Sequence, residues 1–426
     1  MDSNAPRSSS APSLINWPPQ GEFVSLVAIL MAMNALSIDI VLPALGLIGE
    51  SLDQSDGNAI QLIITIYIFS FGCGQLVLGP VSDRFGRRPL LLIALGLFAV
   101  ANGLAASASD FSHLLAARCA QGLTAAALRV SALAIVRDRY QGRQMAKTMS
   151  LVMMVFMAVP LMAPLLGQIL IGLGPWPLIF EASAVLSGFV FLWVALRLPE
   201  SLPPARRRRI SLSTLIDGYR LIISHRSAWG YMLASGFVFG VLFSFITASN
   251  QILLEVYEIG NKFPLAFAGV ASGLAVSNFF NSRLVEAYGM RALSHTALIL
   301  FLGVNCLHAV LAFVGYQPFW LFTVMTALPF VMLGFLGPNF TALALDPLGK
   351  VAGLATSVQG FISTGIAGLF GGWVAHLYNG TPEPYAYGVA ILSAGAVAMV
   401  TWTERGQLRA FRLVKEPPTP PESPSA

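Results

Sequence analysis

The chain has 426 residues, of which 56% are hydrophobic and only 11% are charged, and its mean hydropathy is +0.72. This composition excludes an ordinary soluble globular protein and predicts a protein that lies largely within a membrane. The formal net charge of +5 does not indicate nucleic-acid binding, because the basic residues follow one side of the predicted membrane.

Twelve apolar stretches are each about as long as a helix needs to cross a bilayer, which takes roughly 20 residues. We expect these spans at residues 23–45, 59–80, 90–109, 111–136, 148–172, 177–197, 229–253, 264–286, 292–314, 317–341, 350–376 and 384–403. The first span is too long for the core of a cleavable signal, and the polar segment before it lacks a basic flank. The predicted fold is therefore an all-α membrane protein.

The distribution of basic residues predicts which way the spans run. Of the 25 Lys and Arg residues, Lys262 falls in an outer loop, and Arg118 and Arg129 fall inside the fourth span. The other 22 lie at one face, which the positive-inside rule assigns to the cytoplasm. We expect a multi-pass protein of the cell's inner (plasma) membrane with both termini in the cytoplasm.

The first span contains a carboxylate, Asp39, and a polar amide, Asn34. A charged side chain at the centre of a membrane helix costs about 2.5–3.5 kcal/mol on insertion scales, so Asp39 is expected to face the protein interior or a water-filled cavity. Alternatively, Asp39 lies near enough to the outer surface to be solvated, since Pro43 marks a nearby helix end. We favour a functional carboxylate and place Asn34 in the predicted substrate cavity.

The connection between the second and third spans carries a dense group of charges that cannot enter lipid. An ordinary positive-inside loop would need the arginines, but neither the glycines nor the aspartate at their spacing. The pattern G-x-x-x-D-R-x-G-R-R resembles the loop signature of the major facilitator superfamily, which implies an alternating-access transporter. The resemblance also implies a conformational latch formed by Gly79, Asp83, Arg84, Gly86, Arg87 and Arg88.

The fourth span contains Arg118 about 10 Å below the outer surface, at a depth similar to that of Asp39. Its R-x-x-Q-G-x-x-A-A pattern includes Gln121 and Gly122 and resembles the helix 4 signature of proton-coupled facilitators. The resemblance implies that Arg118 takes part in proton transfer, and we predict that it forms the proton-coupling pair with Asp39. Alternatively, the two charges only neutralise each other. Arg129 is expected to snorkel to the inner surface.

The fifth span contains Pro160, Pro164 and Gly167, and its prolines are expected to bend the helix. A Gly/Pro-rich helix at this position is the antiporter signature of the superfamily. Here Ala-Pro repeats replace the usual Gly-Pro pair, a pattern that resembles the bicyclomycin-resistance (Bcr/CflA) branch of the drug:proton antiporters.

The second half repeats the first at low fidelity. A shift of 203 residues aligns Asp83 and Gly86 with Glu286 and Gly289, which fits two pseudo-symmetric six-helix bundles. We expect a tail at 1–22, bundles at 23–197 and 229–404, a basic linker at 198–228 and a Pro-rich tail at 405–426. Near the outer mouth, the candidates for the substrate cavity are Thr247, Asn250 and Gln251.

These patterns predict a secondary active transporter that exports small, largely apolar drugs or toxic compounds in exchange for protons. One alternative is export of a metabolite such as an amino acid, and another is a passive channel or a receptor that moves nothing. The sequence has no Walker loop, metal-ligand spacing or nucleophile triad, so we expect neither an enzyme nor a cofactor nor a metal. The expected partners are a small-molecule substrate, protons and the lipid bilayer, with no nucleic acid, and we expect a monomer.

Overall fold

The computed structural model describes residues 17–54, 56–140, 142–207 and 212–406, and every regular element in these ranges is helical. The predictions for most of the two tails and for residues 208–211 of the basic linker fall outside the described residues. The helices of the first half are α1 Gln20–Asp39, α2 Leu45–Ser51, α3 Gly57–Ile60, α4 Leu62–Phe85, α5 Arg87–Ala106, α6 Phe111–Arg139, α7 Gly142–Leu173 and α8 Pro177–Arg197. Helix α9, Leu212–Ser224, follows in the linker. Those of the second half are α10 Arg226–Asn250, α11 Phe263–Tyr288, α12 Met290–Phe313, α13 Phe319–Leu345, α14 Ala352–Gly360, α15 Ala367–His376 and α16 Glu383–Thr403.

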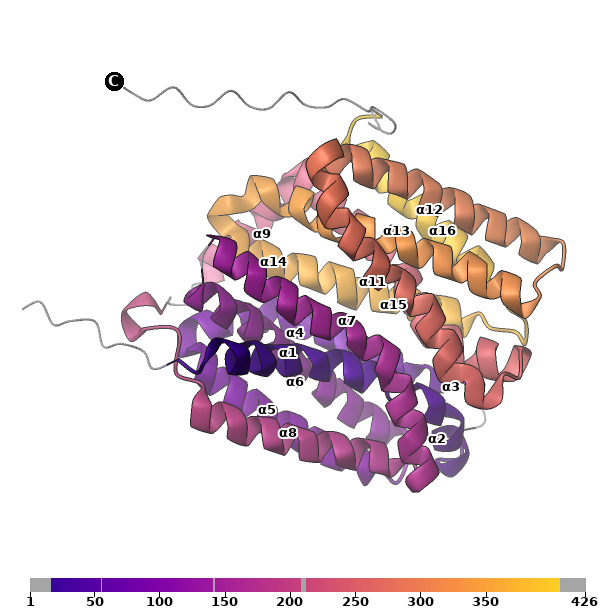
Figure 1. The fold of residues 1–426 in the computed structure, drawn as a ribbon, viewed down its shortest axis with the longest axis horizontal. Coiled ribbons are helices and arrows are strands. Elements are labelled where there is room, and N and C mark those ends of the chain that lie inside the picture. The colour runs from indigo at the N-terminus through magenta and orange to yellow at the C-terminus, as the bar shows by residue number, and fades with distance from the viewer. Residues whose placement is uncertain (1–16, 55, 141, 208–211, 407–426) are drawn as a thin grey trace, which may run out of the picture.

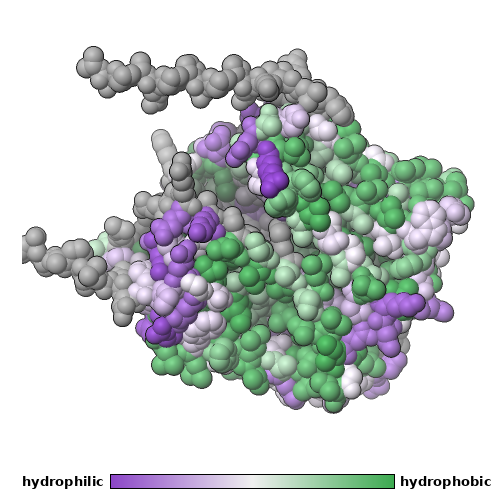
Figure 2. All heavy atoms as spheres, viewed as in Figure 1, coloured by the Kyte–Doolittle hydropathy of each residue, from purple (hydrophilic) through white to green (hydrophobic). Residues whose placement is uncertain are grey.

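The helices are those of a multi-pass membrane protein. In the described residues, eleven helical stretches are long and apolar enough to cross a membrane, and the remaining predicted span lies in α7, which carries the apolar helical stretch Ala158–Leu173. Large apolar side chains point away from the protein: Leu196 is 80% exposed and Phe313 is 81% exposed. Figure 2 shows apolar residues over the middle of one face and hydrophilic residues gathered toward its two ends. The prediction of an all-α membrane fold is confirmed.

The helices form two groups, and they follow the order of the chain. In Figure 1 the helices from α1 to α8 lie together, and those from α10 to α16 lie beside them. The two halves meet along two seams: α4 packs against α14 and α15, and α7 packs against α11. Two π-helical segments interrupt the second half, Gln251–Val256 after α10 and Phe361–Ile366 between α14 and α15.

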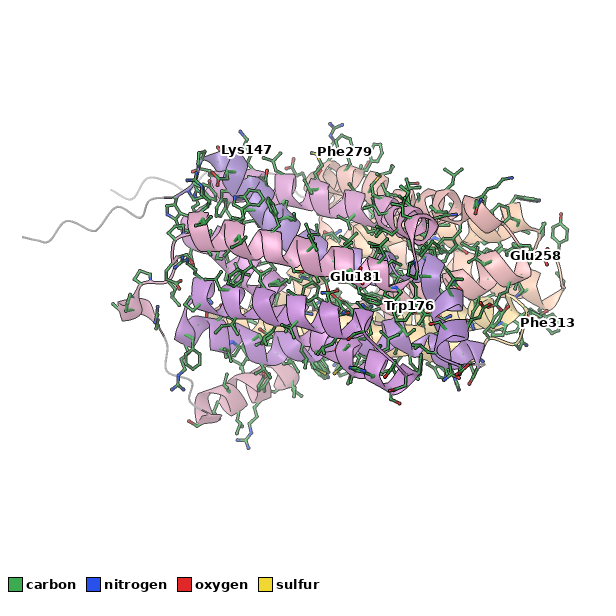
Figure 3. All side chains as sticks on the ribbon, turned by 90° about the horizontal axis from the view of Figure 1, so that it is seen from below. Lys147, Trp176, Glu181, Glu258, Phe279 and Phe313 are labelled. Carbon is green, nitrogen blue, oxygen red and sulfur yellow. The ribbon has the colours of Figure 1, made fainter. Side chains whose placement is uncertain are left out.

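The two ends of the helical body differ. The described chain begins and ends at the same end: Arg139 at the end of α6 donates to the Pro18 carbonyl at 3.0 Å, and Arg226 at the start of α10 donates to the Trp402 carbonyl. We call this end the signature face, because the junction of α4 and α5 also lies there. Figure 3 shows Lys147 toward this end and Glu258 at the other end, which we call the opposite face.

The predicted loop between the second and third spans is shorter than expected. Helix α4 continues to Phe85, α5 begins at Arg87, and Gly86 alone connects them with a φ of +104°. This backbone conformation is essentially restricted to glycine. Gly79 lies inside α4 and allows a close approach to the second half, because a Cβ there would lie 2.5 Å from the Ser357 Oγ of α14.

Helix α7 is continuous through Pro160 and Pro164, and the bend expected at these prolines stays a prediction. One further expectation needs correction. The first span is longer than the predicted 23–45, because a short helical turn and α2 extend it to Ser51. Asp39 therefore lies deeper from the opposite face than the sequence indicated.

Candidate transport cavity and proton-coupling site

A cavity of about 940 Å³ lies between the two halves at the signature face. The ends of α4 and α6 form one wall, with Asp83 and Arg137, and α14 forms the facing wall, with Ser357 and Gln359. Leu215 of α9 lies at its rim. The cavity is large enough for a drug-sized molecule, since ligand pockets typically measure about 300–1,000 Å³.

Hydrogen bonds between the two halves close the opposite face. The Asn58 side-chain amide donates to the Tyr378 carbonyl at 3.1 Å, and the Gln251 amide donates to Asn58 Oδ1 at 2.9 Å. Asn250 Nδ2 donates to the Leu42 carbonyl at 2.7 Å. The protein is therefore in a state that is open on one face and closed on the other, which is one of the two states that alternating access requires.

Glycines let the backbones of the two halves touch along the seam between α4 and the helices from α14 to α15. A Cβ on Gly72 would collide with Gly365, and one on Gly368 would collide with Ile68. Small residues at such contacts allow close helix packing in a membrane. Beside them, Gln75 Nε2 donates to Thr364 Oγ1 at 2.8 Å, so the seam also has a buried polar bond across the halves.

The residues of the predicted helix 4 signature form one unit on α6. Arg118 is 1% exposed. Its guanidinium donates to the carbonyls of Ile63 and Ser37 at 3.0 and 3.2 Å, and to Gln121 Oε1 at 2.7 Å. It lies 4.4 Å from the ring centroid of Tyr67. Gln121 thus orients the guanidinium.

Gly122 completes this unit by allowing α6 to approach α4. A Cβ there would collide with the Tyr67 carbonyl and with the Ser70 hydroxyl. Of the three signature residues, Arg118 is the buried cation, Gln121 orients its guanidinium, and Gly122 makes room for the contact with α4.

Asp39 lies two residues after Ser37, whose carbonyl accepts from this cation. Its side chain is 2% exposed, and its Oδ1 has no hydrogen-bond partner. The alternative in which surface water solvates Asp39 is wrong for this conformation. No ion pair joins Asp39 to Arg118, which instead bonds to the carbonyl of Ser37, two residues earlier. In this state the two charges do not neutralise each other directly.

The chain directly after Asp39 is held by both halves. Gly167 of α7 packs so closely on the Ile40 carbonyl that a Cβ would collide with it. Asn250 of α10 donates to the carbonyl of Leu42, three residues after Asp39. The end of the first span is thus the place where the buried carboxylate meets the closed contact between the halves.

The four residues predicted for the substrate cavity lie outside the lining of the open cavity. Asn250 and Gln251 bridge the halves on the closed side, Asn34 Oδ1 accepts from the Tyr67 hydroxyl at 3.2 Å, and Thr247 Oγ1 donates to the carbonyl of Phe243 on its own helix. Their contact with substrate stays a prediction.

Around the junction of α4 and α5, Arg87 is the centre of an ion-pair network. It pairs with Asp83 at 2.6 Å and with Asp138 of α6 at 3.3 Å. Asp138 also accepts from the Ser201 hydroxyl at 2.7 Å. Arg84 is exposed and lies over the ring of Phe85. The signature residues are thus tied to α6 and to the chain after α8.

Glu200 is a part of this site that the sequence analysis missed. Its carboxylate accepts the backbone N–H groups of Arg87 and Arg88 at 3.0 and 3.3 Å, so it caps the start of α5. The Arg88 side chain donates to the Ala195 carbonyl at 2.7 Å. The available signal was an acidic residue that follows a span directly, on the face where basic residues predominate.

Two helical halves around a cavity that is open on one face and sealed on the other define a membrane transporter. The chain belongs to the Major Facilitator Superfamily, whose family model matches residues 27–372. The superfamily resemblance of the signature segment is confirmed.

Individual relatives are similar over nearly the whole chain. An uncharacterised transporter of this superfamily from Bacillus subtilis (strain 168), YdgK, is 31% identical over 92% of this chain and 95% of its own. A bicyclomycin resistance protein homologue from Haemophilus influenzae is 28% identical over 86% of this chain and 92% of its own, which supports the predicted branch. The fold is similar to that of a bacterial homologue of the human lysosomal transporter Spinster in an inward-facing, unoccupied conformation. That similarity has a TM-score of 0.67 at 16% identity and covers 91% of this chain and 96% of the other.

Proposed function

We propose that this transporter exports small, largely apolar drugs or toxic compounds across the inner membrane in exchange for protons. The similarity to a bicyclomycin resistance protein supports the substrate class. The charge asymmetry of the chain supports cytoplasmic termini. With that orientation the signature face is cytoplasmic, and the cavity is open to the compartment from which drugs are removed.

The observation that carries the proton coupling is the position of Asp39. A buried carboxylate without a partner for one of its oxygens lies two residues after Ser37, whose carbonyl binds the buried guanidinium of Arg118. In general, apolar surroundings favour the protonated carboxyl, and a nearby cation favours the carboxylate. A small movement of α1 against α6 therefore switches Asp39 between binding and releasing a proton.

The chain after Asp39 links this switch to the closure of the opposite face. Asn250 from the second half binds the Leu42 carbonyl only while the halves are closed there. Opening of that face releases the segment from Ile40 to Leu42 and changes the surroundings of Asp39. Substrate release to the outside and proton uptake by Asp39 are thereby coupled to the same movement.

The test is drug-driven proton release from purified protein, with Asp39→Asn compared with wild type. The test drug is chloramphenicol, because the chain is 28% identical, over 75% of its length, to a chloramphenicol resistance protein from Pseudomonas aeruginosa. We expect the Asn variant to fold and to bind chloramphenicol, but to release no protons when the drug binds. Glu181→Gln is the matched control, because Glu181 is an exposed acid on α8, and it should release protons like wild type. Equal release from wild type and from Asp39→Asn removes Asp39 from the mechanism.

A further inference from the structure

The cavity wall contains a second cation of the fourth span, Arg129, which the sequence analysis expected to snorkel toward the signature face. Helices α4 and α6 run side by side in the same direction, and a Cβ on Gly74 would lie 2.7 Å from the Cβ of Ala126. Arg129 is therefore level with about residue 77 of α4. Its guanidinium lies 5.7 Å from the ring centroid of Phe71. At 1.5 Å per residue, Phe71 is about 9 Å further from the signature face than residue 77. The snorkelling prediction is wrong, because the side chain points toward the middle of the protein.

No carboxylate neutralises this guanidinium. Among the described residues, none forms an ion pair or a hydrogen bond with Arg129. Of the other ionisable residues lining the cavity, Asp83 is paired with Arg87, and Arg137 is exposed at the end of α6. The cavity therefore carries an excess of positive charge, and Arg129 is its deepest cation.

An unpaired charge at this depth becomes costly when the cavity closes and water leaves. A ligand that carries a negative charge removes this cost, whereas a neutral ligand leaves the guanidinium unpaired. Arginine suits a carboxylate particularly well, since its planar fork can donate two parallel hydrogen bonds, and the ring of Phe71 lies on one side of this guanidinium.

The facing wall supplies a buried hydrogen-bond acceptor. Gln359 of α14 is 4% exposed and lines the same cavity, and its Oε1 has no hydrogen-bond partner. A ligand whose carboxylate binds Arg129 in the first half and whose own N–H or O–H group donates to Gln359 Oε1 in the second half contacts both halves at once. Such a ligand is able to favour closure of the cavity around it, as a transported substrate must.

We propose that the cavity binds organic anions, with a carboxylate on Arg129 and an apolar body against the remaining wall. This inference names the substrate class of the transport cavity and rests on the proposed export function. Exchange of one monoanion for one proton carries two positive charges inward, so an inside-negative membrane potential would also drive this export.

The experiment uses two probes that differ only in charge, radiolabelled naphthoate and its neutral amide, naphthamide. Binding to the full-length protein in lipid nanodiscs is measured by equilibrium dialysis, with empty nanodiscs as the blank. Wild type should bind naphthoate more tightly than naphthamide. Arg129→Gln should weaken naphthoate binding about tenfold and leave naphthamide binding unchanged, since only a charge-assisted contact is lost.

The matched control is Arg283→Gln on α11, because Arg283 also stacks on a phenylalanine, Phe279, but lies outside the cavity lining. It should bind both probes like wild type, and Arg129→Lys should recover part of the naphthoate affinity. Equal binding of the two probes by wild type, or equal loss of both in Arg129→Gln, overturns the proposal.

Chloramphenicol-driven proton release is measured in parallel: if it persists while the anion preference is absent, only this inference fails. If naphthoate binds through Arg129 and no drug moves protons, the export function fails instead.

Discussion

The two halves of the protein contain the same helix junction in different surroundings. Gly86 joins α4 to α5 with a φ of +104°, and Gly289 joins α11 to α12 with a φ of +77°. In each half, a glutamate directly after the last membrane span binds the start of the third span. Glu200 caps α5 in the first half, and Glu404 pairs with Arg291 of α12 at 3.2 Å in the second half. The turn itself is therefore a feature of the repeated unit.

The surroundings of the two junctions differ. A Cβ on Gly86 would collide with Glu200, whereas a Cβ on Gly289 would have open space around it. Asp83 and Arg87 line the cavity, whereas the exposed Glu286 and the half-exposed Arg291 do not. The comparison indicates that only the first junction is placed to respond to the opening and closing of the cavity.

The largest expected effect comes from Gly86→Ala. The Ala side chain strains the left-handed backbone by about 1–3 kcal/mol and also displaces Glu200 from the start of α5. Gly289→Ala carries the backbone strain alone. Thermal unfolding in detergent should therefore show a lower melting temperature for Gly86→Ala than for Gly289→Ala. Equal losses would mean that the packing around Gly86 contributes nothing.

A smaller effect is expected from removing the central arginine of each junction. Arg87→Gln leaves Asp83 and Asp138 without their shared partner, at a cost of about 1.5–3 kcal/mol for charged hydrogen bonds. Arg291→Gln breaks a pair whose arginine side chain is 44% exposed, and exposed pairs contribute only about 0.2–1 kcal/mol. The same unfolding measurement checks the order. A more severe loss in Arg291→Gln would reverse the comparison.

The sequence predicted the fold well because membrane spans are long apolar runs, and each of the twelve predicted runs falls largely on helical structure, although the run 90–109 continues three residues past the end of α5. It also located Arg118, Gln121 and Gly122, which act together because a spacing of three or four residues keeps them on one helix face. It could not show that Arg118 bonds to carbonyls and not to Asp39, because that depends on the rotation of α1 against α6.

The direction of the Arg129 side chain was missed for a related reason. Depth along a helix follows from counting residues, but the choice between the membrane surface and an internal cavity depends on what the neighbouring helix presents. Here α4 presents the ring of Phe71. Glu200 was missed because its partners, the N–H groups of Arg87 and Arg88, are distant in sequence and become free donors only where α5 begins.

The smallest effect on stability, and the sharpest test of the comparison, is expected from Asp83→Asn. The Asp83 side chain is 42% exposed in its pair with Arg87, so its loss should cost less than about 1 kcal/mol. We propose that Asp83 pairs with further basic groups at the signature face, beyond Arg87, when the opposite face opens, and that it is released from these in the present state. Asp83→Asn should then slow transport of chloramphenicol in proteoliposomes while its binding affinity stays unchanged, since the variant shifts the equilibrium between states and not the binding contacts.

Glu286→Gln, at the equivalent position of the second half, should change neither quantity, because Glu286 does not border the cavity. A loss of affinity in Asp83→Asn with unchanged populations of the two states would contradict the latch. A slowed Glu286→Gln would show instead that both junctions take part in the movement.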